Sequence, residues 1–106
     1  CLHLNSKNEI ISSKLIAIGT LNSVVIHPRE VFREAILASA KSVILVHNHP
    51  SGDVTPSLQD KEITLKLEKA SGLVGINLLD HIIVSKEKWF SFKDENKLQR
   101  TNQFFC

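Results

Sequence analysis

The chain has 106 residues, of which 42% are hydrophobic, and 13 basic residues stand against 11 acidic residues for a net charge of +2. This length and composition predict one compact domain with a single core. No dense basic tract announces a nucleic-acid partner. No apolar run approaches the roughly 20 residues that span a bilayer, so no membrane segment is expected.

The cysteines are Cys1 and Cys106, the first and last residues. They match neither the close pairs of a zinc ribbon nor a disulfide scaffold, so a reduced, cytoplasmic setting is expected. The N-terminus carries no signal-peptide pattern. The chain lacks methionine and starts directly with the alternation CLHLN. We therefore expect residues 1–106 to be one domain of a longer protein, without its N-terminal region.

The first half of the chain predicts strands followed by a helix. Alternation in LHL near the N-terminus is typical of a half-buried strand, and the turn-forming NSKNE leads to a second strand at roughly 10–18. A third β-branched stretch follows at 23–26. From Pro28, which suits a first helical turn, apolar residues recur at helical spacing to about Ala40.

The second half predicts a strand, a loop and a longer helix. SVILV at 42–46 is almost continuously apolar, as in a strand that is buried on both faces. Proline and glycine make 48–56 a loop. Helical spacing predicts a helix over 57–71 that ends at Gly72.

Two more strands are expected at 76–84 and 89–92. The order of strands and helices predicts an α/β fold, with helices packed against a mixed central sheet.

The run VHNHPSGDVTPSLQD, at 46–60, carries the residues best suited to metal binding. His47 and His49 are two apart at a strand end, so their side chains share a face. The loop turns the chain back, which brings Asp60, in the first turn of the next helix, within reach of both rings. Two imidazoles and a carboxylate suit Zn²⁺ and leave a fourth position for an activated water. Ser57 is placed to donate its hydroxyl to an oxyanion.

A simpler interpretation explains part of the same run. Ser57 and Asp60 match the S-x-x-D capping pattern, in which serine caps a helix and the acid reaches back. That pattern requires no metal. The two interpretations are compatible, because a rigid helix start also holds a ligand and an oxyanion donor in place.

The motif H-N-H-P, followed by Ser57 and Asp60, resembles the JAMM signature (H-x-H-P, six residues, S-x-x-D) of the JAB/MPN metalloprotease superfamily. Within it, HPREVFREAI, HNHPSGD with PSLQD, and LLDHIIVS are similar to the bacterial RadC family, over about 23–92. The resemblance implies an MPN domain with a cytidine deaminase-like fold, and His47, His49 and Asp60 as zinc ligands. It implies hydrolysis of a peptide or isopeptide-type bond. The alternatives are a DNA-repair or nucleic-acid-associated module without turnover, or a domain that keeps its metal without activity.

Hydrolysis of an amide also needs a group that takes the proton of the attacking water and passes it on. In JAMM enzymes this group is a glutamate on an early strand, and here that position is expected before Cys1. Inside the chain Glu30 is the best candidate, ahead of Glu9 and Glu34. The helix dipole, however, favours a carboxylate in a first helical turn whatever its function. No pattern specifies the substrate or an oligomeric state.

Asp80 and His81 interrupt an otherwise apolar strand. A buried polar pair needs hydrogen-bond partners, and alternation places at most one of the two on the face of the metal site. We favour a structural role, in which they bind loop amides. The alternative is that one of them orients a metal-binding histidine through its second N–H.

Overall fold

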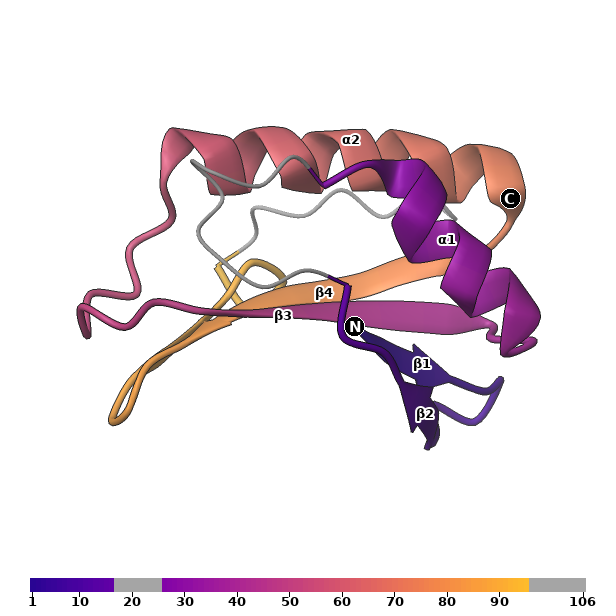
Figure 1. Cartoon of the computed structure of the whole chain (residues 1–106), viewed down its shortest axis with the longest axis horizontal. Helices are drawn as coiled ribbons and strands as arrows, with labels where there is room; N and C mark the ends of the chain where they lie inside the picture. The colour runs from indigo at the N-terminus through magenta and orange to yellow at the C-terminus, as the bar shows by residue number, and fades with distance from the viewer. Residues whose placement is uncertain (17–25, 96–106) are drawn as a thin grey trace.

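The structure is a computed structural model of the chain, and it describes residues 1–16 and 26–95. Within these residues a single small domain combines one sheet with two helices, which confirms the predicted α/β fold (Figure 1). The helices are α1 (Pro28–Leu37) and α2 (Leu58–Val74). The strands are β1 (Leu2–Leu4), β2 (Ile10–Ser13), β3 (Ser42–Asn48), β4 (Asn77–Val84) and β5 (Trp89–Ser91).

The sheet has the strand order β2-β1-β3-β4-β5 and is mixed, as predicted. β3 and β4 are parallel, whereas the other neighbouring pairs are antiparallel. Parallel strands need a crossover connection, and α2 provides it between β3 and β4. Both helices lie on the same side of the sheet (Figure 1).

The hydrophobic core lies between the two helices and one face of the sheet. Val43 and Leu45 on β3 point into it, opposite Leu67 on α2. α1 contributes a patch of three buried residues at helical spacing, as its sequence pattern predicts. The buried core residues are Val31, Phe32, Ala35, Ala40, Val43, Leu45, Ile63, Leu67, Ile76 and Leu78.

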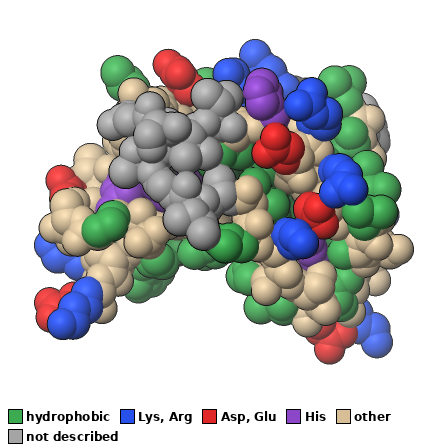
Figure 2. Space-filling model, viewed as in Figure 1, with side chains coloured by type: hydrophobic (Ala, Val, Ile, Leu, Met, Phe, Trp, Pro, Cys, Tyr) green, Lys and Arg blue, Asp and Glu red, His purple; other side chains and the backbone are tan. Residues whose placement is uncertain are grey.

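The other face of β3 differs from the prediction that this strand is buried on both sides. Ile44 is half-buried and Val46 is 38% exposed. The reason is that the two described helices cover the same face of the sheet (Figure 1). Figure 2 shows the molecule hollowed on the side away from the helices, with hydrophobic side chains bordering the hollow.

Both helices end at other residues than predicted. α1 stops at Leu37 instead of about Ala40, because Ser39 takes a left-handed conformation with φ of 55°. α2 continues through Gly72, so the prediction that it ends there is wrong. Gly75 adopts φ of 74° and donates its N–H to the carbonyl of Ser71, which closes the helix three residues later. Neither described helix is long and apolar enough to cross a membrane.

Five of the six predicted strands are present, and several differ in length. β2 ends at Ser13, so only the first part of the expected strand at 10–18 is formed, and 17–18 lie outside the described residues. In the third expected strand, 23–25 also lie outside the described residues, and Ile26 is not in a strand. β4 and β5 confirm the predicted strands at 76–84 and 89–92. β4 starts one residue later than predicted, and β5 ends one residue earlier.

The packing of α2 against the sheet predicts that shortening a buried side chain of this helix strongly lowers the stability of the fold. Leu67 is fully buried against the sheet, so Leu67→Ala is expected to lower the free energy of unfolding by about 2–5 kcal/mol in urea denaturation. Leu73 lies on the same helix but is 89% exposed, and Leu73→Ala should change it by less than about 0.5 kcal/mol. Equal losses in the two variants would contradict this assignment of the core.

Candidate metal centre

The end of β3 places two histidines side by side. His47 is the penultimate residue of the strand, and the N–H of His49 still bonds to the carbonyl of Val84, 2.8 Å away. The pleat therefore continues through His49, and the two side chains share one face. Their ring centroids lie 4.7 Å apart in an edge-to-face arrangement.

The start of α2 places the carboxylate. Ser57 is the N-cap, and its Oγ accepts the N–H of Asp60 at 3.1 Å. In return, Asp60 Oδ2 accepts the N–H of Ser57 at 2.8 Å, which completes a capping box. The capping interpretation of the sequence is thus confirmed. It also holds the carboxylate of Asp60, which is fully buried, in one orientation.

His47, His49 and Asp60 converge on one point. Asp60 Oδ1 lies 3.2 Å from His47 Nδ1, and Asp60 Oδ2 lies 3.2 Å from His49 Nε2. One potential ligand atom from each residue lies within 4.8 Å of the others. Tetrahedral zinc with ordinary bond lengths separates neighbouring ligand atoms by about 3.4 Å. The spacing of the donor set therefore fits a small divalent cation.

A backbone carbonyl selects the tautomer of the neutral His49 ring. Gly52 adopts φ of 89° and donates its N–H to the carbonyl of His49, which turns the chain back. The carbonyl oxygen of Asp53 then lies 2.8 Å from His49 Nδ1. Because a carbonyl only accepts, Nδ1 carries the hydrogen, and Nε2 of the neutral ring presents a lone pair to Asp60. Two acceptors that face each other require a proton or a cation between them.

His47 also faces the carboxylate of Asp60. Its Nδ1 and Asp60 Oδ1 are buried, and neither atom has a hydrogen-bond partner among the described residues. Burial lowers the pKa of His47, and it outweighs the opposite effect of the Asp60 charge. The ring is therefore neutral near pH 7, which is the form that binds a metal.

Asp80 and His81 fall on opposite faces of β4. Asp80 is paired with Ile44 and points away from the helices, whereas His81 is paired with Leu45 and points toward α2. The carboxylate of Asp80 accepts the backbone N–H groups of His81 and Lys93. Bonds to backbone amides are what we expected from a structural role of Asp80. Within residues 1–16 and 26–95, neither Asp80 nor His81 is hydrogen-bonded to His47 or His49.

His81 is buried behind the cluster. Its Nδ1 lies 2.6 Å from Thr64 Oγ1, and its ring is 6.5 Å from that of His47. Burial lowers the pKa of His81 to about 4, so the ring is neutral near pH 7. Thr64 is not among the residues predicted from the sequence, although its position four residues after Asp60 places it on the same face of α2. The carbonyl of Asp53 is a second unpredicted contact, because no side-chain pattern reveals a backbone group.

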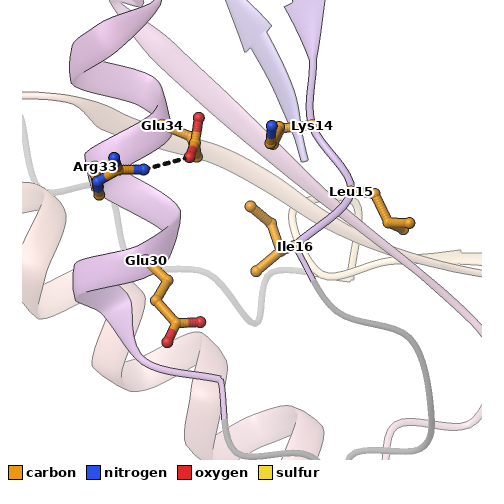
Figure 3. A pocket seen from close by; sticks show the side chains of 6 residues that line it. All are labelled: Lys14, Leu15, Ile16, Glu30, Arg33 and Glu34. Carbon is orange, nitrogen blue, oxygen red and sulfur yellow. Dashed lines mark hydrogen bonds and ion pairs between the residues drawn. The ribbon is translucent and has the colours of Figure 1, made fainter.

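The structure does not bring Glu30 into the cluster. Glu30 lies exposed in the first turn of α1 and lines a cavity of about 230 Å³ (Figure 3). Glu34 is ion-paired with Arg33 at 2.7 Å, and Glu9 accepts a hydrogen bond from Asn5. The role of Glu30 as a base stays a prediction. The cavity is lined by Lys14, Leu15, Ile16, Glu30, Arg33 and Glu34, none of which is a candidate ligand.

The sequence of this chain is similar to a known protein family and to known bacterial proteins. The sequence model of the RadC-like JAB domain family matches residues 1–98. The chain is 57% identical over 97 residues to a UPF0758 protein of Chlorobium chlorochromatii, covering 92% of this chain and 44% of that protein. It is 51% identical over 98 residues to the UPF0758 protein YsxA of Bacillus subtilis, with 92% and 42% covered. The chain thus spans less than half the length of these relatives.

The lowered pKa of His81 predicts a pH-dependent stability. The unfolded chain takes up a proton near pH 6.5, whereas the folded chain does so only at about 4. Metal-free protein should therefore lose stability as the pH falls from about 6.5 to about 4, by on the order of 3 kcal/mol from this residue. Urea denaturation across this range measures it. His81→Asn, which cannot titrate there, should show a flatter dependence, and identical pH profiles would contradict the assignment.

Proposed function

This chain belongs to the RadC-like JAB domain family, and from this membership and the geometry of His47, His49 and Asp60 we propose that it is a zinc-dependent hydrolase of amide or isopeptide bonds. When bound, zinc polarises a carbonyl and supplies a water whose pKa is about 7. One observation carries the proposal. His49 Nε2 turns a lone pair toward a buried carboxylate that His47 also faces, an arrangement that a divalent cation stabilises.

Three features of this chain prepare the ligands. The carbonyl of Asp53 holds a hydrogen on His49 Nδ1 and leaves Nε2 facing Asp60, and burial lowers the pKa of His47, which favours its neutral form. The N–H of Ser57 holds the carboxylate of Asp60. Three protein ligands leave a further position for water or substrate, which is typical of catalytic rather than structural zinc sites.

Ser57 is the proposed oxyanion donor. Its Oγ accepts the N–H of Asp60, and its hydroxyl hydrogen has no acceptor among the residues that the structure describes. Ser57 is half-buried at the N-terminus of α2, where the helix dipole adds positive potential. A negative charge that develops on a substrate oxygen is therefore stabilised at this position.

The register of β1 supports a proton carrier upstream of Cys1. Leu2 is paired with Ile44 in antiparallel orientation, so each step toward the N-terminus moves one step toward the histidines of β3. Continued in this register, the second residue before Cys1 pairs with His47 and the fourth lies opposite His49. Both share the face of the ligands. A glutamate at either position is our proposed base.

Nucleic-acid association, which the RadC resemblance also suggests, gains no specific support. Lys and Arg side chains are mixed with Asp and Glu over the face drawn in Figure 2. The identity of the substrate, the choice of zinc over other metals and a cytoplasmic location stay predictions.

Metal analysis tests the proposal. Protein purified without chelators and supplied with zinc should hold one zinc per chain, measured by elemental analysis. His49→Ala and Asp60→Asn should lose it, because the first removes a ligand and the second replaces a charged ligand with a neutral amide. His27→Ala removes an exposed histidine outside the cluster and should keep full occupancy.

Two results would contradict the metal site: wild-type protein without zinc, or a loss of zinc in His27→Ala as large as in the ligand variants. Turnover is tested with a peptide library, read by mass spectrometry. Cleavage should disappear with a chelator and return with added zinc.

The position of the base is tested in a chain that carries residues before Cys1. Changing a glutamate at the second or fourth position before Cys1 to glutamine should lower kcat by about 10²–10⁴-fold, because proton transfer is lost, while zinc content is retained. Glu30→Gln should leave kcat unchanged. A comparable loss of turnover in Glu30→Gln would instead assign the base to α1.

A further inference from the structure

Two consecutive hydrogen bonds lead from β4 to the ligand-bearing turn of α2. Thr64 Oγ1 lies 2.7 Å from the carbonyl oxygen of Asp60 and 2.6 Å from His81 Nδ1. A carbonyl only accepts, so the single hydroxyl hydrogen of Thr64 goes to Asp60. His81 Nδ1 must then carry the hydrogen that Thr64 accepts. Both side chains are buried, so solvent does not compete for either bond.

The ring of His81 is held from its other side as well. Phe92 stacks on it with ring centroids 4.7 Å apart and planes within 2° of parallel. Asp80 accepts the hydroxyl of Ser91 and the N–H of Lys93, which fixes the chain on both sides of Phe92. The two polar residues of β4, Asp80 and His81, thus have different roles. Asp80 holds the stacking partner, and His81 points the N–H at Thr64.

We propose that Thr64 and His81 are positioning residues that set the metal affinity of the site by fixing Asp60. This inference rests on the proposed function. His81 is paired with Leu45 on β3, so the two hydrogen bonds tie Asp60 to the strand pair that carries the other ligands. Residues 49–57 join β3 to α2 without regular structure. This loop alone therefore does not set the distance between Asp60 and the two histidines.

Apolar packing is the competing explanation. α2 also packs on the sheet through Ile63 and Leu67, and helical threonines commonly bond to the carbonyl four residues earlier. The two explanations make opposite predictions for Thr64. Thr64→Val keeps the shape and removes the hydroxyl, whereas Thr64→Ser keeps the hydroxyl and removes a methyl group. Packing alone favours valine, and the hydrogen bonds favour serine.

The experiment measures zinc affinity of the full chain by competition with a chromophoric chelator. Thr64→Val should bind zinc about ten- to a hundredfold more weakly than wild type, and Thr64→Ser should stay close to wild type. Equal affinities of the two variants, or tighter binding by Thr64→Val, would overturn the positioning role. Urea denaturation of the metal-free variants checks that each is folded.

A second pair of variants keeps the inference testable if Thr64→Val does not fold. His81→Asn places an amide N–H near the position of Nδ1, whereas His81→Gln places it near Nε2. His81→Asn should bind zinc more tightly than His81→Gln, and equal affinities of these two variants would overturn the role of Nδ1. Wild-type protein that fails to bind zinc overturns the proposed function too. Tight binding by wild type and by every variant overturns only the positioning role.

Discussion

The buried carboxylate of Asp60 is the constraint on which the rest of the site depends. An anion without exposure to water is costly unless charge or hydrogen bonds compensate for it. The N–H of Ser57 and the dipole of α2 compensate for part of this cost. The neighbouring imidazole of His49 presents a lone pair, so it adds to the requirement for a cation. The capped helix start and the strand end are therefore parts of one electrostatic arrangement.

The parallel pairing of β3 and β4 makes that arrangement possible. Parallel strands end on the same side of the sheet, so the crossover helix must start near the end of the first strand. The short turn after β3 and the capping box of α2 consequently lie next to each other. β1 runs antiparallel to β3 and pairs with the first residues of that strand, Ser42 to Ile44. The end of β3 and the start of α2, which a loop separates in the sequence, thus meet at the candidate metal site.

Local patterns predicted most of the fold and the three candidate ligands. The spacing of His47 and His49 and the capping pattern of Asp60 follow from strand and helix geometry, so they are readable from the sequence. The bond between His81 and Thr64 joins residues 17 apart and depends on how α2 lies on β4. Which of two glycines ends α2, and which sheet face the helices cover, are likewise decided by tertiary packing.

The backbone contact at His49 has a consequence for how this loop can vary among related chains. The group that orients the ring is the carbonyl of Asp53, which every amino acid possesses. Side-chain identity at this position is therefore weakly constrained by the contact, whereas an insertion or deletion between His49 and Asp53 would move the carbonyl away. Evolution should conserve the length of this turn more strictly than its composition, apart from the left-handed glycine at Gly52.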